Sequence, residues 1–211
     1  GAAGAALVAT LRPAAAQAPE PLESYRPAWF TSAEFAFVTA ATGRLIPSGG
    51  DGPGAREARV PVFIDRQMLT PFGTGEWWYM QGPHVPDADP KLGYQTPLTP
   101  QQIYREGIAT VDAWCRSTRG QIFSELPEAD QDAVLTALEQ GEVPMPATLR
   151  NFFEMLLQNT KEGYFSDPIH GGNAGMAAWV YVGFPGARAS FREWIDRHDV
   201  PYPLGPVSIS G

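Results

Sequence analysis

Prolines and glycines interrupt this chain so often that only short segments between them can form regular structure. The 211 residues include 21 prolines and 22 glycines. This combined share lies above the usual value of about 12% but below the roughly 25–30% typical of disordered chains. Proline lacks a backbone donor and glycine lacks conformational restraint, so both end regular elements. We therefore expect compact elements joined by long, ordered, irregular loops.

Two helices carry clear starting signals. Thr31 and Glu34 have the spacing of a capping box, which predicts a helix from Thr31 that ends before Pro47. Thr99 and Pro100 stand where a helix cap and a first helical residue belong, so a second helix is predicted to begin there. No alternating strand pattern persists anywhere in the chain. The predicted fold class is all-α: an irregular helical domain whose long Pro/Gly-rich loops wrap a partner subunit.

Other helical segments follow from apolar spacing and from helix-ending residues. Asp65 and Arg66 alternate with apolar residues in the second of these segments and are expected to be solvated. Gly163 is expected to end the strongly amphipathic segment that starts near Leu149. The predicted segments are 55–69 with a new start at Val60, 127–141, 149–163 and 190–198.

The chain is predicted to hold one helical domain, residues 31–200, between an extended lead-in (19–30) and a Pro-rich tail (201–211). Residues 1–18 are apolar and Ala-rich, and are far shorter than the ~20 residues needed to span a bilayer. Their small-x-small ending resembles the end of an export signal of the twin-arginine type. They are either cleaved or retained, and the alternative is an Ala-rich tail without a targeting role.

Charge and cysteine content exclude several functions. The formal net charge of −8 disfavours nucleic acid as a partner. A single cysteine, Cys115, excludes an internal disulfide, a Cys-based zinc site, an iron–sulfur cluster and the covalent attachment of haem c. Cys115 falls on the apolar stripe of its helix and is predicted to be a buried thiol. The alternative is a disulfide with another subunit.

The sequence offers no self-sufficient catalytic, cofactor-binding or metal-binding site. His84, His170 and His198 stand in unrelated segments without nearby ligand partners. The pair Asp167 and His170 is the one suggestive case, and we interpret it as a hydrogen-bonded turn. A stand-alone exported hydrolase that uses these two residues is the alternative reading.

Residues 70–98 show no periodicity and contain three adjacent aromatic residues, 77–79. Structureless loops of this length in compact domains are usually functional or disordered. Three adjacent aromatic side chains cannot all point inward from one loop, so some are expected to contact a partner. They cap the domain's own core in one alternative, and they stack on sugar rings in a carbohydrate-binding module in another.

Residues 167–186 combine Gly-rich turns and two prolines around a short apolar run, an arrangement suited to shape rather than to chemistry. This segment resembles the carboxy-terminal motif of the gluconate 2-dehydrogenase subunit 3 family. The resemblance extends through residues 31–65, 92–95 and 104–108, although Ala174 and Gly175 depart from the charged residues common there. The matching motif positions are Gly171, Gly172, Asn173, Met176, Trp179, Gly183, Phe184, Pro185 and Gly186.

This resemblance implies a non-catalytic small subunit of a membrane-bound, flavin-dependent dehydrogenase, most simply a gluconate 2-dehydrogenase. In such complexes FAD belongs to the large subunit and haem c to a multi-haem cytochrome c subunit, which passes electrons to quinone. The small subunit is expected to support folding, export and stability of the flavoprotein in the periplasm, at the inner membrane. The residues expected at the partner interface are Trp77, Trp78, Tyr79, Gly171, Gly172, Asn173, Trp179, Phe184 and Pro185.

Overall fold

A computed structural model describes residues 21–85 and 88–210, and this part of the chain is helical and without a β-strand. The all-α prediction is therefore confirmed. The predicted export signal and the start of the lead-in lie outside the described residues. The helices are α1 (Ser32–Leu45), α2 (Val60–Gln67), α3 (Pro71–Thr74), α4 (Pro100–Arg119), α5 (Glu128–Glu139), α6 (Phe152–Phe165) and α7 (Ala177–Val182).

The two predicted helix starts are confirmed in detail. The Thr31 side chain accepts a hydrogen bond from the Glu34 backbone, and the Glu34 carboxylate accepts one from the Thr31 backbone. Thr99 and Gln102 form the same reciprocal pair at the start of α4. Each box satisfies two amide donors that a helix start otherwise leaves without partners. Both helices consequently begin where local sequence places them.

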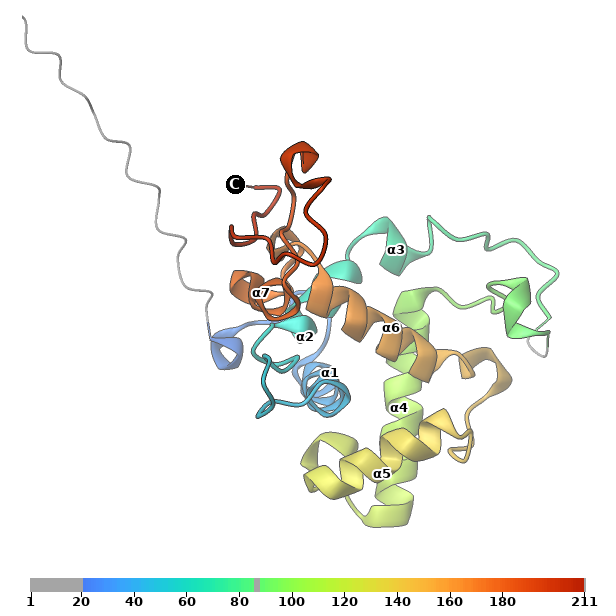
Figure 1. Ribbon diagram of the computed structural model, residues 1–211. Helices are drawn as coiled ribbons and strands as arrows, with labels where there is room; N and C mark the ends of the chain where they lie inside the picture. The colour runs from blue at the N-terminus through green and yellow to red at the C-terminus, as the bar shows by residue number, and fades with distance from the viewer. Residues whose placement is uncertain (1–20, 86–87, 211) are drawn as a thin grey trace, which may run out of the picture.

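The central helix of the domain is α1, which packs against α2, α4, α5 and α6 (Figure 1). Phe37 of α1 and Tyr104 of α4 both contact the ring of Phe152 on α6, with centroid distances of 6.2 and 6.0 Å. A Cβ at Gly107 would lie 2.4 Å from that ring, so the glycine lets α4 and α6 approach closely. The Tyr104 hydroxyl donates to Asn159, which satisfies the polar end of a fully buried ring.

Asp65 corrects the sequence prediction, because it is fully buried instead of solvated. Its carboxylate accepts hydrogen bonds from the Tyr25 hydroxyl and from the backbone amides of Ala28, Trp29 and Phe30, at 2.7–3.0 Å. Burial, together with this hydrogen bond, raises the pKa of Tyr25 to about 12, so the phenol remains a donor at neutral pH. The carboxylate thus fastens the lead-in to α2.

Two predicted helix boundaries were wrong. Gly163 lies inside α6, where a Cβ would be 2.8 Å from the ring of Phe63 on α2, so it serves helix packing and not helix termination. The segment 190–198 forms a single 3-10 turn, Arg192–Trp194. Its aromatic residues Phe191 and Trp194 contact Tyr202 of the tail, at 5.5 and 5.1 Å between centroids. These aromatic side chains pack against the tail, and no residue of the turn Arg192–Trp194 is buried.

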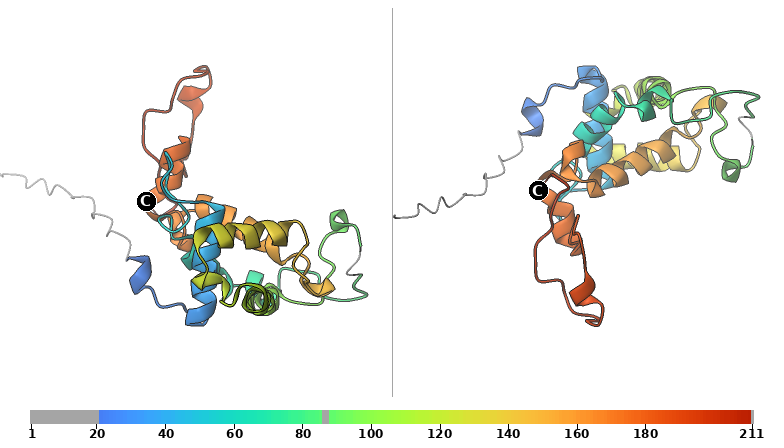
Figure 2. Two further views of the ribbon diagram at one scale, coloured as in Figure 1. Left: turned by 90° about the horizontal axis from the view of Figure 1, so that it is seen from below. Right: turned by 90° about the horizontal axis from the view of Figure 1, so that it is seen from above.

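The predicted loop 70–98 is irregular apart from α3 and a 3-10 turn, Pro90–Leu92. This loop and the segment after α7 project from the helical body in different directions (Figure 2). The end of the tail returns to the domain, since the Ala187 amide donates to Val207 and the Val207 amide donates to Pro185. Residues 188–206, which include the Pro-rich stretch 201–206, therefore form a loop whose two ends are joined by these hydrogen bonds.

Replacing Asp65 by Asn is expected to lower the free energy of unfolding by about 2–4 kcal/mol. The NH2 group of asparagine would replace one carboxylate oxygen and would face two hydrogen-bond donors in a buried site. Denaturant unfolding of the two proteins measures this difference. The exposed Asp51 provides the control, since Asp51→Asn removes a charge without a buried partner. Equal losses in both variants would contradict the role assigned to Asp65.

Candidate partner-binding site

The Gly-rich motif after α6 comprises residues 167–186 and includes α7, so we call it the α7 motif. A close backbone approach holds it against α6. A Cβ at Gly172 would lie 2.1 Å from the carbonyl oxygen of Gly163, so no larger residue fits there. Gly171 precedes it with φ of 99°, a left-handed conformation that favours glycine. The Ala174 amide donates to Ala58, which ties the motif to the turn before α2. The motif is thus held by backbone contacts with α6 and with the turn before α2.

Asn173 is fully buried and organises the start of α7. Its side-chain amide donates to the Ser166 carbonyl, and its side-chain oxygen accepts from the Ala178 amide, both at 2.9 Å. Its backbone has φ of 42°, a left-handed conformation that asparagine tolerates better than most residues. The side chain therefore links the end of α6 to α7 from within.

Trp179 and Phe184 form the aromatic centre of the motif. The buried Trp179 indole donates to the Phe165 carbonyl at 2.8 Å. The Phe184 ring meets Trp179 edge to face, with centroids 5.1 Å apart, and remains about half exposed. Pro185, the next residue, accepts a backbone hydrogen bond from Val207. Trp179 consequently supports the motif, whereas Phe184 reaches its surface.

The outer side of this motif carries a series of exposed apolar side chains. Val180 and Val182 on α7 are 62% and 51% exposed, and Phe184 follows them at 47%. Phe165, beside Trp179, and Ile169 are similarly exposed at 47% and 45%. Their supporting backbone is fixed by the hydrogen bonds of Asn173 and Trp179. A surface of this kind is apolar, preformed and suited to another protein.

The aromatic residues of the 70–98 loop separate into one inner and two outer side chains. Trp78 packs between Phe72 and Tyr94, with centroid distances of 5.9 and 4.6 Å. Trp77 and Tyr79 are 70% and 75% exposed. The expectation that the three rings cannot all point inward agrees with this arrangement.

The carboxylate of Asp167 binds the tail of the chain, while its backbone carbonyl accepts a hydrogen bond from the His170 amide at 3.0 Å, which forms the predicted hydrogen-bonded turn. The carboxylate accepts from the Ser208 hydroxyl and from the amides of Ile209 and Ile169, at 2.7–3.1 Å. Burial acts to raise the pKa of this carboxyl, but these hydrogen bonds and the nearby His170 outweigh burial and lower the pKa below its ordinary value. His170 is exposed, so the two residues are not arranged as a base and its orienting acid.

Cys115 lies in the core of the domain with no exposed surface. Burial, with a smaller effect of Asp112, raises the pKa of its thiol to about 11. Such a thiol is neutral at physiological pH and is a poor nucleophile. In this conformation the sulfur is out of reach of a second subunit, which favours the buried-thiol interpretation over an intersubunit disulfide.

Across residues 21–85 and 88–210, no group of three or more His, Cys, Asp or Glu side chains is placed to hold a metal ion. Within the same described part of the chain, no helix combines the length and the apolar character needed to cross a bilayer. Two exposed apolar surfaces, on the 70–98 loop and on the α7 motif, stand out among the described residues.

A protein-family comparison agrees with the motif. The family model described as Gluconate 2-dehydrogenase subunit 3 matches residues 32–186. This match covers well over half of the chain. The chain belongs to this family. No curated protein and no solved structure matched it in the corresponding searches. The matched residues include α1 through α7 and end at Gly186, where the tail meets the motif.

Sequence reasoning located this motif but missed how it is anchored. Ser208 and Ile209 donate hydrogen bonds to Asp167, which lies about forty positions earlier in the chain. No local sequence pattern indicates contacts of this kind. A signal did exist for Asp65, a charged residue directly after the apolar pair Phe63 and Ile64. A carboxylate that directly follows two buried apolar residues lies either at the edge of the buried face or inside it, with hydrogen-bond partners for both oxygens.

Gly172→Ala is expected to destabilise the fold by about 1–3 kcal/mol, because the added methyl group would collide with the Gly163 carbonyl. The melting temperature of the purified chain measures this loss. Gly50→Ala is the matched control, since no atom lies within 4 Å of a Cβ at Gly50. Similar melting temperatures for both variants would show that the close approach is not required.

The stability contributed by Asp167 is expected to depend on pH. Its folded pKa is lowered, so the ionised carboxylate stabilises the fold above the unfolded value of about 3.9, and this stabilisation is lost as the pH falls through the folded pKa. Asp167→Asn should therefore be less stable than the wild type at neutral pH, with a gap that closes below about pH 4. Urea unfolding at a series of pH values measures this gap. A gap that persists unchanged in acid would contradict the assignment.

Proposed function

We propose that this chain is the non-catalytic small subunit of a gluconate 2-dehydrogenase complex, and that it supports folding, export and stability of the flavin-containing large subunit. The family match places the chain among subunits of that dehydrogenase. In the proposal, oxidation of the sugar acid takes place at FAD in the large subunit. Electrons then pass to a multi-haem cytochrome c subunit and on to quinone, in a periplasmic complex at the inner membrane.

The observation that carries this proposal is the preformed apolar surface of the α7 motif. Burying a large apolar side chain contributes roughly 1.5–3 kcal/mol, and leaving several of them in water forgoes that contribution. Val180, Val182 and Phe184 remain exposed although hydrogen bonds beneath them fix their backbone. An interaction partner recovers this free energy without ordering a flexible loop, which favours tight association.

The exposed aromatic residues of the 70–98 loop supply a second contact region. Trp77 and Tyr79 present large apolar areas at low cost in side-chain entropy, a property that makes such residues dominant in protein interfaces. Trp78 anchors the same stretch to the domain through Phe72 and Tyr94. The proposal thus assigns contact to the two outer rings and support to the inner one.

Val182→Asp should lower recovery of the flavin-containing large subunit by about tenfold or more, because a charge at the centre of an apolar interface costs at least ~1.4 kcal/mol. Affinity purification of the tagged small subunit from co-expressing cells, followed by the flavin absorbance of the eluate, measures recovery. The variant alone should melt at the wild-type temperature, because Val182 is exposed.

Val200→Asp is the matched control for this experiment. Val200 and Val182 are the same residue type and are both 51% exposed, but Val200 lies beyond the residues matched by the family. The control is expected to retain the large subunit. Equal recovery with the two variants would reject the α7 surface as the interface.

A further inference from the structure

Two neighbouring cavities lie beside α1. The larger, of about 580 Å³, is lined by α1 and extends from Leu22 of the lead-in to Gln131 of α5. The smaller, of about 390 Å³, shares part of this lining. Both are lined by Leu22, Glu23, Ser48 and Arg56. Their sizes fall in the range of small-ligand sites. The two cavities therefore lie side by side, separated by these shared residues.

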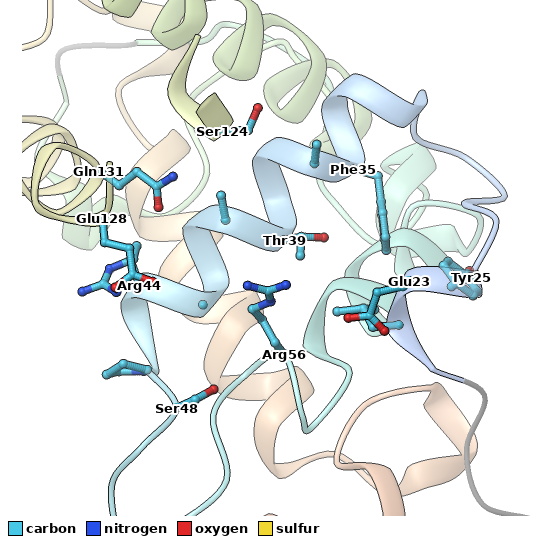
Figure 3. A pocket seen from close by; sticks show the side chains of 15 residues that line it. Glu23, Tyr25, Phe35, Thr39, Arg44, Ser48, Arg56, Ser124, Glu128 and Gln131 are labelled. Carbon is cyan, nitrogen blue, oxygen red and sulfur yellow. The ribbon is translucent and has the colours of Figure 1, made fainter. Parts of the chain in front are cut away.

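Small residues of α1 form the wall of the larger cavity, and Arg56 crosses them. A Cβ at Gly43 would lie 2.9 Å from the Arg56 side chain, so the arginine stem rests on the glycine. Figure 3 shows the Arg56 guanidinium below α1, close to Thr39. The Arg56 side chain forms no ion pair or hydrogen bond in the described part of the chain. Its five donors are available to the cavity.

Arg59 lines the smaller cavity and has an unpartnered donor although it is only 9% exposed. Its Nη1 is buried and has no hydrogen-bond partner among the described residues, and the same holds for Oγ1 of Thr39 in the larger cavity. The Arg59 guanidinium lies 5.7 Å from the centroid of the Tyr25 ring. Buried polar atoms without partners are rare and costly, so each one calls for a ligand or an explanation.

The backbone of Arg59 adds a second cost. Its φ of 58° and ψ of 32° are left-handed, a conformation that costs a non-glycine residue roughly 1–2 kcal/mol. Glycine would hold the start of α2 without this strain. The position of the Arg59 guanidinium at the cavity is therefore accompanied by backbone strain and by desolvation of a charged group.

The acidic side chains nearby are largely committed elsewhere. Glu57 accepts the Gly54 amide, and Glu128 is paired with Arg44, which also binds Asp132. Glu23 is the remaining carboxylate that lines both cavities, and it is exposed. The lining is thus balanced in charge, with Arg44, Arg56 and Arg59 against Glu23, Glu57 and Glu128. Within the described part of the chain, Arg44 has carboxylate partners, whereas the guanidinium groups of Arg56 and Arg59 form no ion pair.

We propose that these cavities bind an oxyanion, a carboxylate or a phosphate, between Arg56 and Arg59. The guanidinium fork matches the paired oxygens of such a group, and charge-assisted hydrogen bonds of this type are about twice as strong as neutral ones. Arg56 lines both cavities with its unpaired guanidinium, and Arg59 adds a second guanidinium to the lining of the smaller one. The anion is either free in solution or carried by an acidic peptide segment.

Isothermal titration of the full chain with inorganic phosphate and with a hexaglutamate peptide tests this site, with sodium chloride at matched ionic strength as the blank. Saturable binding of either probe is expected. The Kd should rise about tenfold or more in Arg56→Gln and in Arg59→Gly, since each removes a charge-assisted bond worth at least ~1.4 kcal/mol. Phosphate binding identifies a free oxyanion site, and binding of the peptide alone identifies a segment of another chain.

The variants separate binding from folding. Arg59→Gly relieves the left-handed strain and is expected to melt at or above the wild-type temperature, and Arg56 is exposed. Arg192→Gln removes an exposed guanidinium at a distance from the cavities and should bind like the wild type. Binding of neither probe, or binding unchanged in both Arg56→Gln and Arg59→Gly, overturns the proposal. Because the full chain is titrated alone, the result is independent of the proposed dehydrogenase partner.

Discussion

Both carboxylate oxygens of Asp65 are buried, and each accepts two hydrogen bonds from the segment that leads into α1. A buried carboxylate is tolerated only when its lone pairs are satisfied, because removing it from water costs several kcal/mol. The segment must therefore remain at α2 for the charge to remain buried. In return, the lead-in places Phe30 in the core and sets the position from which Thr31 caps α1. Much of the arrangement of the amino-terminal half follows from this one group.

The junction between α6 and the motif that follows it depends on close backbone approach. Gly163 and Gly172 allow α6 and the following motif to meet at backbone distance, and Asn173 then bridges the end of α6 to α7. This rigid base is what leaves the outer side of α7 apolar and exposed. Rigidity and exposure together favour a binding surface.

The protein thus presents two kinds of surface that differ in chemistry and location. The α7 motif and the 70–98 loop offer apolar and aromatic area, which suits a large protein partner. The cavities beside α1 offer unpartnered guanidinium groups, which suit a small anionic group. Buried polar contacts of Asn173 fix the α7 motif, and those of Asp65 with Tyr25 fix the lead-in beside the cavities. The core itself holds its single thiol in a neutral, inert state.

The sequence by itself determined the helical fold class, the starts of α1 and α4 and the family motif. Those features depend on residues within about one helical turn, such as the Thr31–Glu34 and Thr99–Gln102 boxes, whose hydrogen bonds form wherever the helix forms. It also placed Cys115 in the core, because apolar spacing along one helix is a local property.

Only the tertiary structure decided the burial of Asp65, the place of Gly163 inside α6 and the return of the tail to Asp167. Each depends on an element that arrives from far along the chain, namely residues 25–30, Phe63 and residues 207–209. The same holds for which aromatic rings of the 70–98 loop stay exposed, because Trp78 turns inward to meet Phe72 and Tyr94. Local patterns record what a residue prefers, but burial and pairing are set by whichever neighbour the fold brings to it.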